Sequence, residues 1–260
     1  MASYREGSLT SRQFESQVLD YPIHQRRLLP LLAQAVAMGF TSLQMTRLFE
    51  DMTAQLESFT ADSSEEETRA VLEKLKETHA TSAGLKAFCT WAGLETIERC
   101  RASCGGHGYS AYVGLASMYN DQAVQCTWEG DNTILSLQSG RALISSYEDV
   151  TRGTTMLGGS AYLNELPGIL KVSCSAKPGD AELFALETID QAWACAAANA
   201  IKKAHDDFAA YRSGSLGGRK MDKDEALELC SQERFVAAKL HTIGYIFRCA
   251  ACACLARPRG

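Results

Sequence analysis

Apolar residues recur three to five positions apart along most of the chain, a spacing that predicts amphipathic α-helices. The first such stretch follows Asp20, a suitable helix N-cap, and Pro22, whose fixed φ suits a first helical turn. We expect one long helix with a bend at Pro30, where the proline ring removes a backbone hydrogen bond. Its apolar positions are Leu28, Leu32, Val36, Phe40, Leu43, Leu48, Met52, Leu56 and Phe59.

Polar residues and glycines divide the rest of the chain. Residues 60–64 are polar and separate the first helix from a second one over 65–100, so the pattern predicts a helical hairpin. A glycine-rich turn at 104–110 follows, and helical spacing then resumes from about 118 to 147. Residues 118–147 are therefore expected to form a single helix.

Five glycines and two prolines gather between residues 151 and 180. This composition predicts a linker between a first domain, residues 1–150, and a second, residues 181–260. Two further helices, over about 181–211 and 222–255, are expected in the second domain. Since no stretch of any length has β-strand character, the chain is assigned to the all-α class.

The composition, with 46% hydrophobic and 22% charged residues, is ordinary for a soluble globular protein. A net charge of -5 gives no reason to expect nucleic acid as a partner, because phosphate binding needs clustered Lys and Arg. Ten cysteines without an N-terminal apolar signal favour a reducing compartment and free thiols. The longest apolar runs, 31–40 and 249–256, are too short to cross a bilayer, so no membrane span is expected.

Glu129 is the candidate catalytic base, because it stands between Trp128 and Gly130. A carboxylate held against an apolar wall such as Trp128 loses hydration, which raises its proton affinity and makes it a better base. Gly130 would leave room for backbone to approach a flat ring or a thioester. The alternative is a helix-surface glutamate that happens to precede a glycine.

Two neighbouring motifs are candidate ligand sites. Residues 106–111 fit the G-x-G-x-x-A fingerprint of dinucleotide-binding folds, but residues 94–103 before them look helical, and the fingerprint needs a strand there. We reject that interpretation, and a simple turn between helices remains the alternative. Asp131, Asn132 and Thr133 could place polar groups along a cofactor or cap a helix.

Metal and hydrolase sites are not predicted. Cys249, Cys252 and Cys254 have no second Cys or His pair nearby, and only His241 is close in sequence. A serine-hydrolase triad is excluded because the chain has no G-x-S-x-G elbow.

The glycine turn and the Trp-Glu-Gly motif, in this order, resemble the peroxisomal acyl-CoA oxidase family of the acyl-CoA dehydrogenase/oxidase superfamily. Leu19-Asp20-Tyr21-Pro22, followed by Gln25 and by residues 28–33, resembles the entry to that family's C-terminal helical domain. The resemblance implies an acyl-CoA dehydrogenase-type C-terminal helical bundle, followed by a partial second helical domain. It covers most of the chain.

The resemblance implies FAD-dependent oxidation of a fatty acyl-CoA to trans-2-enoyl-CoA, with O2 reduced to H2O2 in fatty acid β-oxidation. Glu129 matches the residue that takes the α-proton while the β-hydrogen leaves as hydride to the flavin. The glycine turn matches a loop that packs against the adenosine and pyrophosphate side of FAD, often one bound mainly by the neighbouring subunit. The residues placed along FAD are Gly105, Gly106, Gly108, Asp131, Asn132 and Thr133.

Arg12-Gln13-Phe14 resembles the tail of the family's Arg-Arg-Gln-Phe-Gly segment, in which an arginine reaches the FAD pyrophosphate across a dimer interface. Ser11 stands where the first arginine is expected and Glu15 where the glycine is expected. The departure removes one bidentate cation and adds a carboxylate, which would weaken phosphate binding.

Family members of this type carry a helical domain and a β-barrel before the part seen here, so an interior fragment is expected. A homodimer, or a heterodimer with a full-length oxidase, is also expected. The resemblance implies a peroxisomal location, although residues 256–260 are not a Ser-Lys-Leu-type tail, and the cytoplasm is the alternative. The other functional hypotheses are a non-catalytic helical module that dimerises with a full-length homologue and an accessory protein of a secondary-metabolite pathway.

Overall fold

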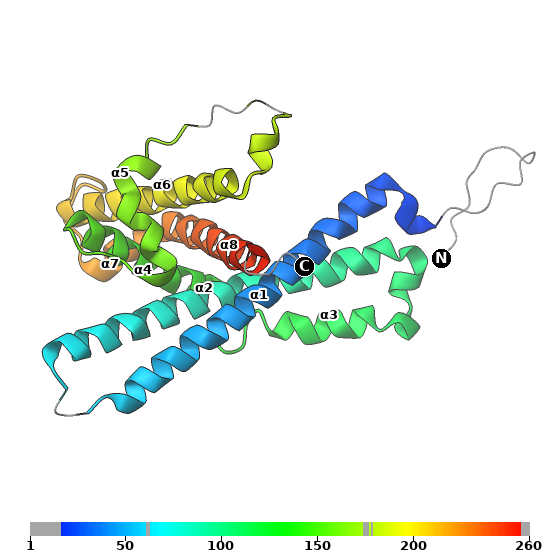
Figure 1. Ribbon diagram of the computed structural model, residues 1–260, viewed down its shortest axis with the longest axis horizontal. Helices are drawn as coiled ribbons and strands as arrows, with labels where there is room; N and C mark the ends of the chain where they lie inside the picture. Colours follow the sequence, from blue (N-terminus) through cyan, green and yellow to red (C-terminus); the bar gives the residue numbers. More distant parts are fainter. Residues whose placement is uncertain (1–16, 61–62, 174–176, 178, 256–260) are drawn as a thin grey trace, which may run out of the picture. The chain divides into compact units, whose positions relative to one another are not determined.

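The described residues of the computed structural model, 17–60, 63–173, 177 and 179–255, contain helices and no β-strand (Figure 1). The all-α prediction is confirmed for this part of the chain. The α-helices are α1 (Pro22–Ser58), α2 (Glu65–Ser103), α3 (Leu115–Val124), α4 (Asn132–Thr151), α5 (Leu166–Ile169), α6 (Leu186–Ser213), α7 (Lys223–Leu229) and α8 (Ser231–Leu255). Short 3₁₀ helices are η1 (Val18–Asp20), η2 (Gly105–Tyr109), η3 (Ala111–Val113), η4 (Gly158–Glu165) and η5 (Ala181–Phe184).

Helices α1 and α2 form the predicted hairpin, and Pro30 lies inside α1 rather than ending it (Figure 1). The second helix begins where it does because Ser64 and Glu67 form a capping box. The backbone N–H of Ser64 donates to Glu67 Oε2 at 2.8 Å, and the Glu67 N–H donates to Ser64 Oγ at 3.2 Å. Each side chain thereby satisfies a backbone donor that the first helical turn leaves free.

The single helix predicted over 118–147 is wrong, because the chain leaves the helical conformation between α3 and α4. Glu129 has φ 55° and Gly130 has φ 114°, and neither value belongs to a right-handed helix. Asp131 then caps α4, since its Oδ1 accepts from the backbone N–H of Thr133 at 2.8 Å and of Ile134 at 3.2 Å. The break therefore results from a turn conformation that hydrophobic spacing does not encode.

The described chain divides into two compact units, and the division does not follow the boundary predicted at residue 150. The first unit contains residues 17–36 and 90–125, and the second contains residues 37–89 and 126–255. In the first unit, Gln122 Nε2 donates to the Thr90 carbonyl at 3.2 Å and ties α3 to α2.

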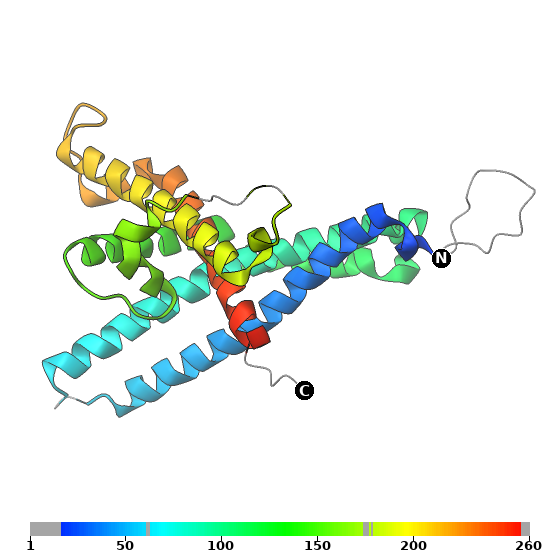
Figure 2. The ribbon, with the colours of Figure 1, turned by 45° about the horizontal axis from the view of Figure 1, so that its top comes forward.

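The core of the second unit lies among α4, α6 and α8, which gather together in both views (Figures 1 and 2). Leu163 and Leu166, from the segment 151–180 that was expected to be a linker, are buried in this core. Burying a leucine or isoleucine side chain contributes about 1.5–3 kcal/mol, so residues 158–169 are part of the folded structure. The buried members are Leu143, Ile144, Tyr147, Leu163, Leu166, Ala198, Ile201, Ala204, Leu227, Cys230 and Ala237.

Close helix packing in the second unit depends on glycine at two positions. A Cβ at Gly140 of α4 would lie 2.4 Å from the carbonyl oxygen of Arg234 in α8. A Cβ at Gly84 of α2 would lie 2.7 Å from Thr242 Oγ1, also in α8. Because real Cβ atoms do not approach so closely, a side chain at Gly140 requires the helices to shift, and one at Gly84 requires the Thr242 side chain or its helix to move.

A polar network lies against the same helices. The hydroxyl of Tyr162 and Nδ1 of His241 are 3.1 Å apart, and the Arg248 guanidinium lies 4.8 Å from the centre of the Tyr162 ring. Arg248 Nη1 donates to Asp190 Oδ1 at 3.2 Å. Burial, assisted by the charge of Arg248, lowers the pKa of His241 to about 3, so this imidazole stays neutral in the folded protein at ordinary pH.

Helix α1 is long and apolar enough to cross a bilayer, judged by length and composition, with a stretch of mean hydropathy 1.4 of which 11% is buried. Runs of consecutive apolar residues do not reveal this property, because polar residues interrupt the apolar positions of α1. Core helices of soluble proteins pass the same test, so the absence of a membrane span stays a prediction.

Replacing Gly140 with alanine should lower the free energy of unfolding by about 1–3 kcal/mol, because the new methyl group collides with the Arg234 backbone. Gly39→Ala is the matched control, since apart from its chain neighbours and the backbone of its own helix nothing lies within 4 Å of its Cβ position in α1. The free energy of unfolding of Gly39→Ala should rise by about 0.5–1 kcal/mol, because alanine is the better helix former. Urea denaturation measures the stability of both variants. Equal changes in Gly140→Ala and Gly39→Ala would show that close packing at Gly140 does not require glycine.

The free energy of unfolding should fall as the pH drops from about 6.5 towards 3. The unfolded chain binds a proton at His241 near pH 6.5, whereas the folded chain leaves this group neutral down to pH about 3. One proton bound only by the unfolded state changes stability by about 1.4 kcal/mol per pH unit.

Subtracting urea midpoints of a His241→Gln variant isolates this effect, because other titrating groups contribute to both proteins. The stability difference between wild type and variant should be constant above pH 7 and shift steadily below pH 6. A difference that is independent of pH would show that His241 is protonated equally in both states.

Candidate functional site

The turn between α3 and α4 carries the candidate base in an unusual backbone conformation. Among the described residues other than glycine, Glu129 alone has positive φ, at 55°. The left-handed region costs such a residue roughly 1–2 kcal/mol, and strain of this kind gathers at functional sites. Gly130 adopts φ 114°, which a residue with a side chain rarely reaches.

The Trp128 and Glu129 side chains of this turn lie at the surface, whereas Cys126 is buried. Glu129 is exposed, and half of the Trp128 side chain is exposed. The structure therefore does not show the dehydrated carboxylate that the sequence analysis expected from a wall formed by Trp128. Any dehydration of Glu129 has to come from a group that covers this surface.

Lys86 of α2 fixes the backbone beside Glu129. Its Nζ donates to the carbonyl oxygen of Gly130 at 2.6 Å and to Asn132 Oδ1 at 2.8 Å. Hydrogen bonds from an ionised donor are shorter and roughly twice as strong as neutral ones. Lys86 was not predicted as a site residue, because a lysine on an amphipathic helix gives no signal that separates it from a solvent-facing residue.

Asn132 completes the attachment of the turn to α2. It is fully buried, its Nδ2 donates to the Ala87 carbonyl at 3.2 Å, and its backbone N–H donates to the Cys126 carbonyl at 3.1 Å. Its side chain therefore stabilises the fold and is not presented at the surface. Asp131 caps α4 and Thr133 is exposed, so these two residues remain accessible beside Glu129.

The glycine turn in the first unit combines a packed position with two open ones. Gly108 is buried, and a Cβ there would lie 1.9 Å from the carbonyl oxygen of Arg101. Gly105 and Gly106 are exposed, with no atom within 4 Å of their Cβ positions, so a ligand could approach this backbone. Arg12, the third part of the expected cofactor site, lies outside the described residues.

Two aromatic side chains next to the glycine turn were also missed. Tyr109 and Tyr112 are almost completely exposed, at 86% and 103%. Their position in short 3₁₀ helices gives them no hydrophobic periodicity to detect. Exposed aromatic residues in such a place are suited to contact a ligand or a partner.

A groove of about 590 Å³ runs between α1 and α2 in the second unit. Lys86 lies at this groove as well as beneath the Glu129 turn. The other lining residues are Met38, Thr41, Ser42, Met45, Thr46, Phe49, Ser82, Leu85 and Cys89. The larger side chains among them are apolar, which suits a hydrocarbon chain better than a charged group.

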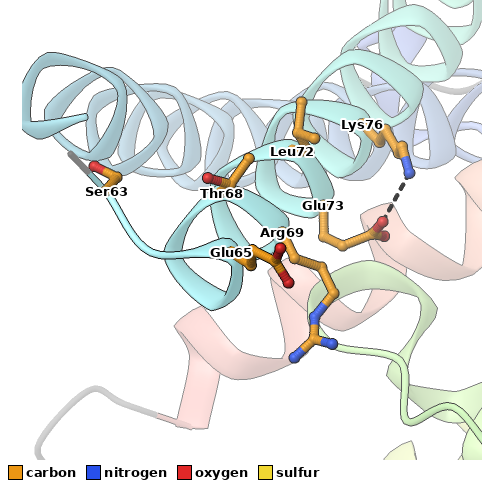
Figure 3. Close-up of a pocket in the computed structure, with 7 residues that line it drawn as sticks. All are labelled: Ser63, Glu65, Thr68, Arg69, Leu72, Glu73 and Lys76. Atoms are coloured by element: carbon orange, nitrogen blue, oxygen red, sulfur yellow. Dashed lines mark hydrogen bonds and ion pairs between the residues drawn. The ribbon is translucent and has the colours of Figure 1, made fainter. Parts of the chain in front are cut away.

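A second hollow, drawn in Figure 3, is formed by residues 63–76 at the start of α2. Glu73 and Lys76 form an ion pair of 2.7 Å there, and both side chains are mostly exposed. Ion pairs of this kind contribute little to stability. None of the predicted site residues lines this hollow.

Within the described part of the chain, no three His, Cys, Asp or Glu side chains come together as metal ligands would. Cys249 lies partly buried in α8, and burial raises the pKa of its thiol, whereas Cys252 and Cys254 are exposed. Loss of hydration disfavours the thiolate that metals bind.

The family model described as "Acyl-CoA oxidase, C-alpha1 domain" matches residues 2–144. Acyl-coenzyme A oxidase 2 of Yarrowia lipolytica is 40% identical over 238 residues, which are 92% of this chain and 33% of that protein. Peroxisomal acyl-coenzyme A oxidase 1 of Rattus norvegicus is 32% identical over 91% of this chain and 34% of its own length.

The solved structures agree with these matches. The crystal structure of acyl-CoA oxidase 1 from Yarrowia lipolytica has a TM-score of 0.83 and 33% identity, covering 94% of this chain and 35% of that one. The corresponding values for acyl-CoA oxidase 3 are 0.79 and 38%, over 94% and 34% of the two chains. The chain thus spans about a third of its relatives' length, and by its matched residues it belongs to the acyl-CoA oxidase family as a C-terminal helical part.

Proposed function

We propose that this chain is the C-terminal part of an acyl-CoA oxidase, which oxidises a fatty acyl-CoA to trans-2-enoyl-CoA and passes the electrons to O2, giving H2O2. The observation that carries the proposal is the strained turn that presents Glu129 inside the matched family region. A surface glutamate without a role would gain stability by leaving the left-handed region.

Glu129 acts as the general base that removes the α-proton of the thioester. When bound, FAD supplies the acceptor for the hydride that leaves the β-carbon. Because Glu129 is exposed in the isolated chain, the bound substrate has to cover it and remove its hydration. Loss of hydration raises the pKa of a carboxylate and so increases its strength as a base.

The residues proposed to hold FAD are Gly105 and Gly106, whose backbone is open, and Asp131 and Thr133 beside the base. Acyl-CoA oxidase-1 of Caenorhabditis elegans, 25% identical with a TM-score of 0.77, was solved as a complex with FAD and ATP. Asn132 is left out of this set, because its buried amide is already bonded to α2. Arg12 stays in the proposal as a pyrophosphate ligand from the sequence alone.

The proposed location is the peroxisome, as the name of the rat relative indicates for that protein. The proposed partner is a second copy of the chain or a full-length oxidase. Large apolar side chains are exposed on α1 in each unit and would be covered by such a partner. Those in the first unit are Ile23, Leu29, Leu32 and Val36, and those in the second are Leu43, Phe49 and Leu56.

The second candidate function is a non-catalytic helical module that dimerises with a full-length oxidase, in fatty acid breakdown or as an accessory protein in secondary metabolism. The exposure of Glu129 favours it, because nothing in the described chain dehydrates the carboxylate. A chain that spans a third of its relatives also leaves much of the substrate site to other segments.

Replacing Glu129 with glutamine should lower peroxide release from the purified chain with FAD and a fatty acyl-CoA by about 10²–10⁴-fold, the usual contribution of a general base. Glu95→Gln is the control, because Glu95 is exposed and forms only a surface ion pair with Arg99. Its turnover should match that of wild type.

Unchanged turnover in Glu129→Gln would remove Glu129 as the base. The colour of the purified chain separates the two candidate functions. Yellow chain that carries flavin supports the enzyme, whereas colourless chain that captures a full-length oxidase supports the non-catalytic module.

Replacing Glu129 with glycine should raise the free energy of unfolding by about 0.5–1 kcal/mol, because glycine adopts φ 55° without steric cost. Glu129→Gln keeps the Cβ and the strain, so its stability should equal that of wild type. Thermal and urea denaturation of both variants measure the difference. A loss of stability in Glu129→Gly would show that the left-handed conformation is not strained here.

A further inference from the structure

We propose that Lys86 is a positioning residue that holds the Glu129 turn in its strained conformation. The proposal rests on the proposed function for the role of Glu129 as the base. The attachment of the turn to Lys86 is a property of the fold and does not depend on that role. Lys86 is on α2, far in sequence from the turn.

The contacts of Lys86 are placed on the turn immediately after Glu129. Its ammonium donates to the carbonyl oxygen of Gly130 at 2.6 Å, which orients the peptide that leads into α4. The same ammonium donates to Asn132 Oδ1 at 2.8 Å. One point charge therefore binds two groups on either side of Asp131.

Asn132 connects the Lys86 contact to the other end of the turn. Its backbone N–H donates to the Cys126 carbonyl at 3.1 Å, so the chain is closed from Cys126 to Asn132 with Glu129 inside. Its Nδ2 donates to the carbonyl of Ala87, the neighbour of Lys86 on α2. Asn132 is thus bonded both to a short stretch of α2 and to the Cys126 end of the turn.

This attachment explains how a glutamate keeps φ 55°. A left-handed residue returns to a relaxed conformation unless its surroundings over-determine its backbone. The two charge-assisted bonds of Lys86 and the buried amide of Asn132 supply that restraint. Lys86 acts on the turn through the backbone carbonyl of Gly130 and the side-chain amide of Asn132.

The experiment compares Lys86→Met, Lys86→Arg and the control Lys76→Met in the full chain. Lys76 is an exposed lysine of the same helix that pairs only with Glu73 on the surface, at 2.7 Å. Amide hydrogen exchange is followed by mass spectrometry in the peptide that contains the Asn132 N–H, which is bonded to Cys126 in the folded turn.

In Lys86→Met, exchange at the turn should rise at least tenfold, while exchange in α6 and α8 stays at the wild-type rate. Lys86→Arg should fall between wild type and Lys86→Met, because a planar guanidinium keeps the charge but does not reproduce a compact ammonium. Lys76→Met should match wild type. If Lys86→Met does not fold, the same local rise in Lys86→Arg decides the question.

Turnover provides the second readout. Where the wild-type chain releases peroxide, Lys86→Met should lower kcat at least tenfold with a smaller change in KM. In the Glu129→Gln background it should cause no further loss, since it acts through Glu129. Where the wild-type chain shows no turnover, the proposed function fails, and the exchange result still decides the role of Lys86.

Two results would overturn the proposal. One is an unchanged exchange rate at the turn in a folded Lys86→Met variant. The other is a rise of equal size throughout α6 and α8, which would make Lys86 a residue of general stability.

Discussion

The ammonium of Lys86, shared between the Gly130 carbonyl and the Asn132 amide, is the contact on which the arrangement around Glu129 depends. It joins a regular helix to a turn whose backbone is unfavourable by itself. The fold thus provides the rigidity, and the turn provides the exposed carboxylate. A loop without such an attachment would hold Glu129 less precisely, and a misplaced reacting group costs much of the rate that orientation supplies.

Much of the helical framework can be predicted from the sequence because its signals are local. Ser64 and Glu67 mark the start of α2, and the apolar spacing of 65–100 predicts most of its length. The single helix predicted over 222–255 is wrong, because the chain leaves the α-helical conformation at Cys230, between α7 and α8. The break between α3 and α4 could not be predicted in this way, since the residues around Glu129 keep helical spacing while φ is positive. The segment 151–180 looked like a linker because its glycines and prolines outnumber the two leucines that reach the core.

The candidate site was predictable where a motif exists and not where geometry alone defines it. The glycine turn and Glu129 were recognised as motifs, and helix capping was weighed for Asp131, which does cap α4. Asn132 was placed along the cofactor because sequence does not reveal that an amide next to a cap is buried. Lys86 could not be found, because a contact between α2 and the α3–α4 turn joins positions that are distant along the chain.

The exposed apolar side chains of α1 affect how the chain behaves when it is produced by itself. Side chains such as Leu32 and Leu43, more than half exposed, carry a hydration cost of about 25 cal/mol for each Å² left in water. Chaperones and other unfolded chains bind such surfaces, so isolated expression favours aggregation. Co-expression with a protein that covers α1 is therefore the condition under which a well-dispersed sample is to be expected.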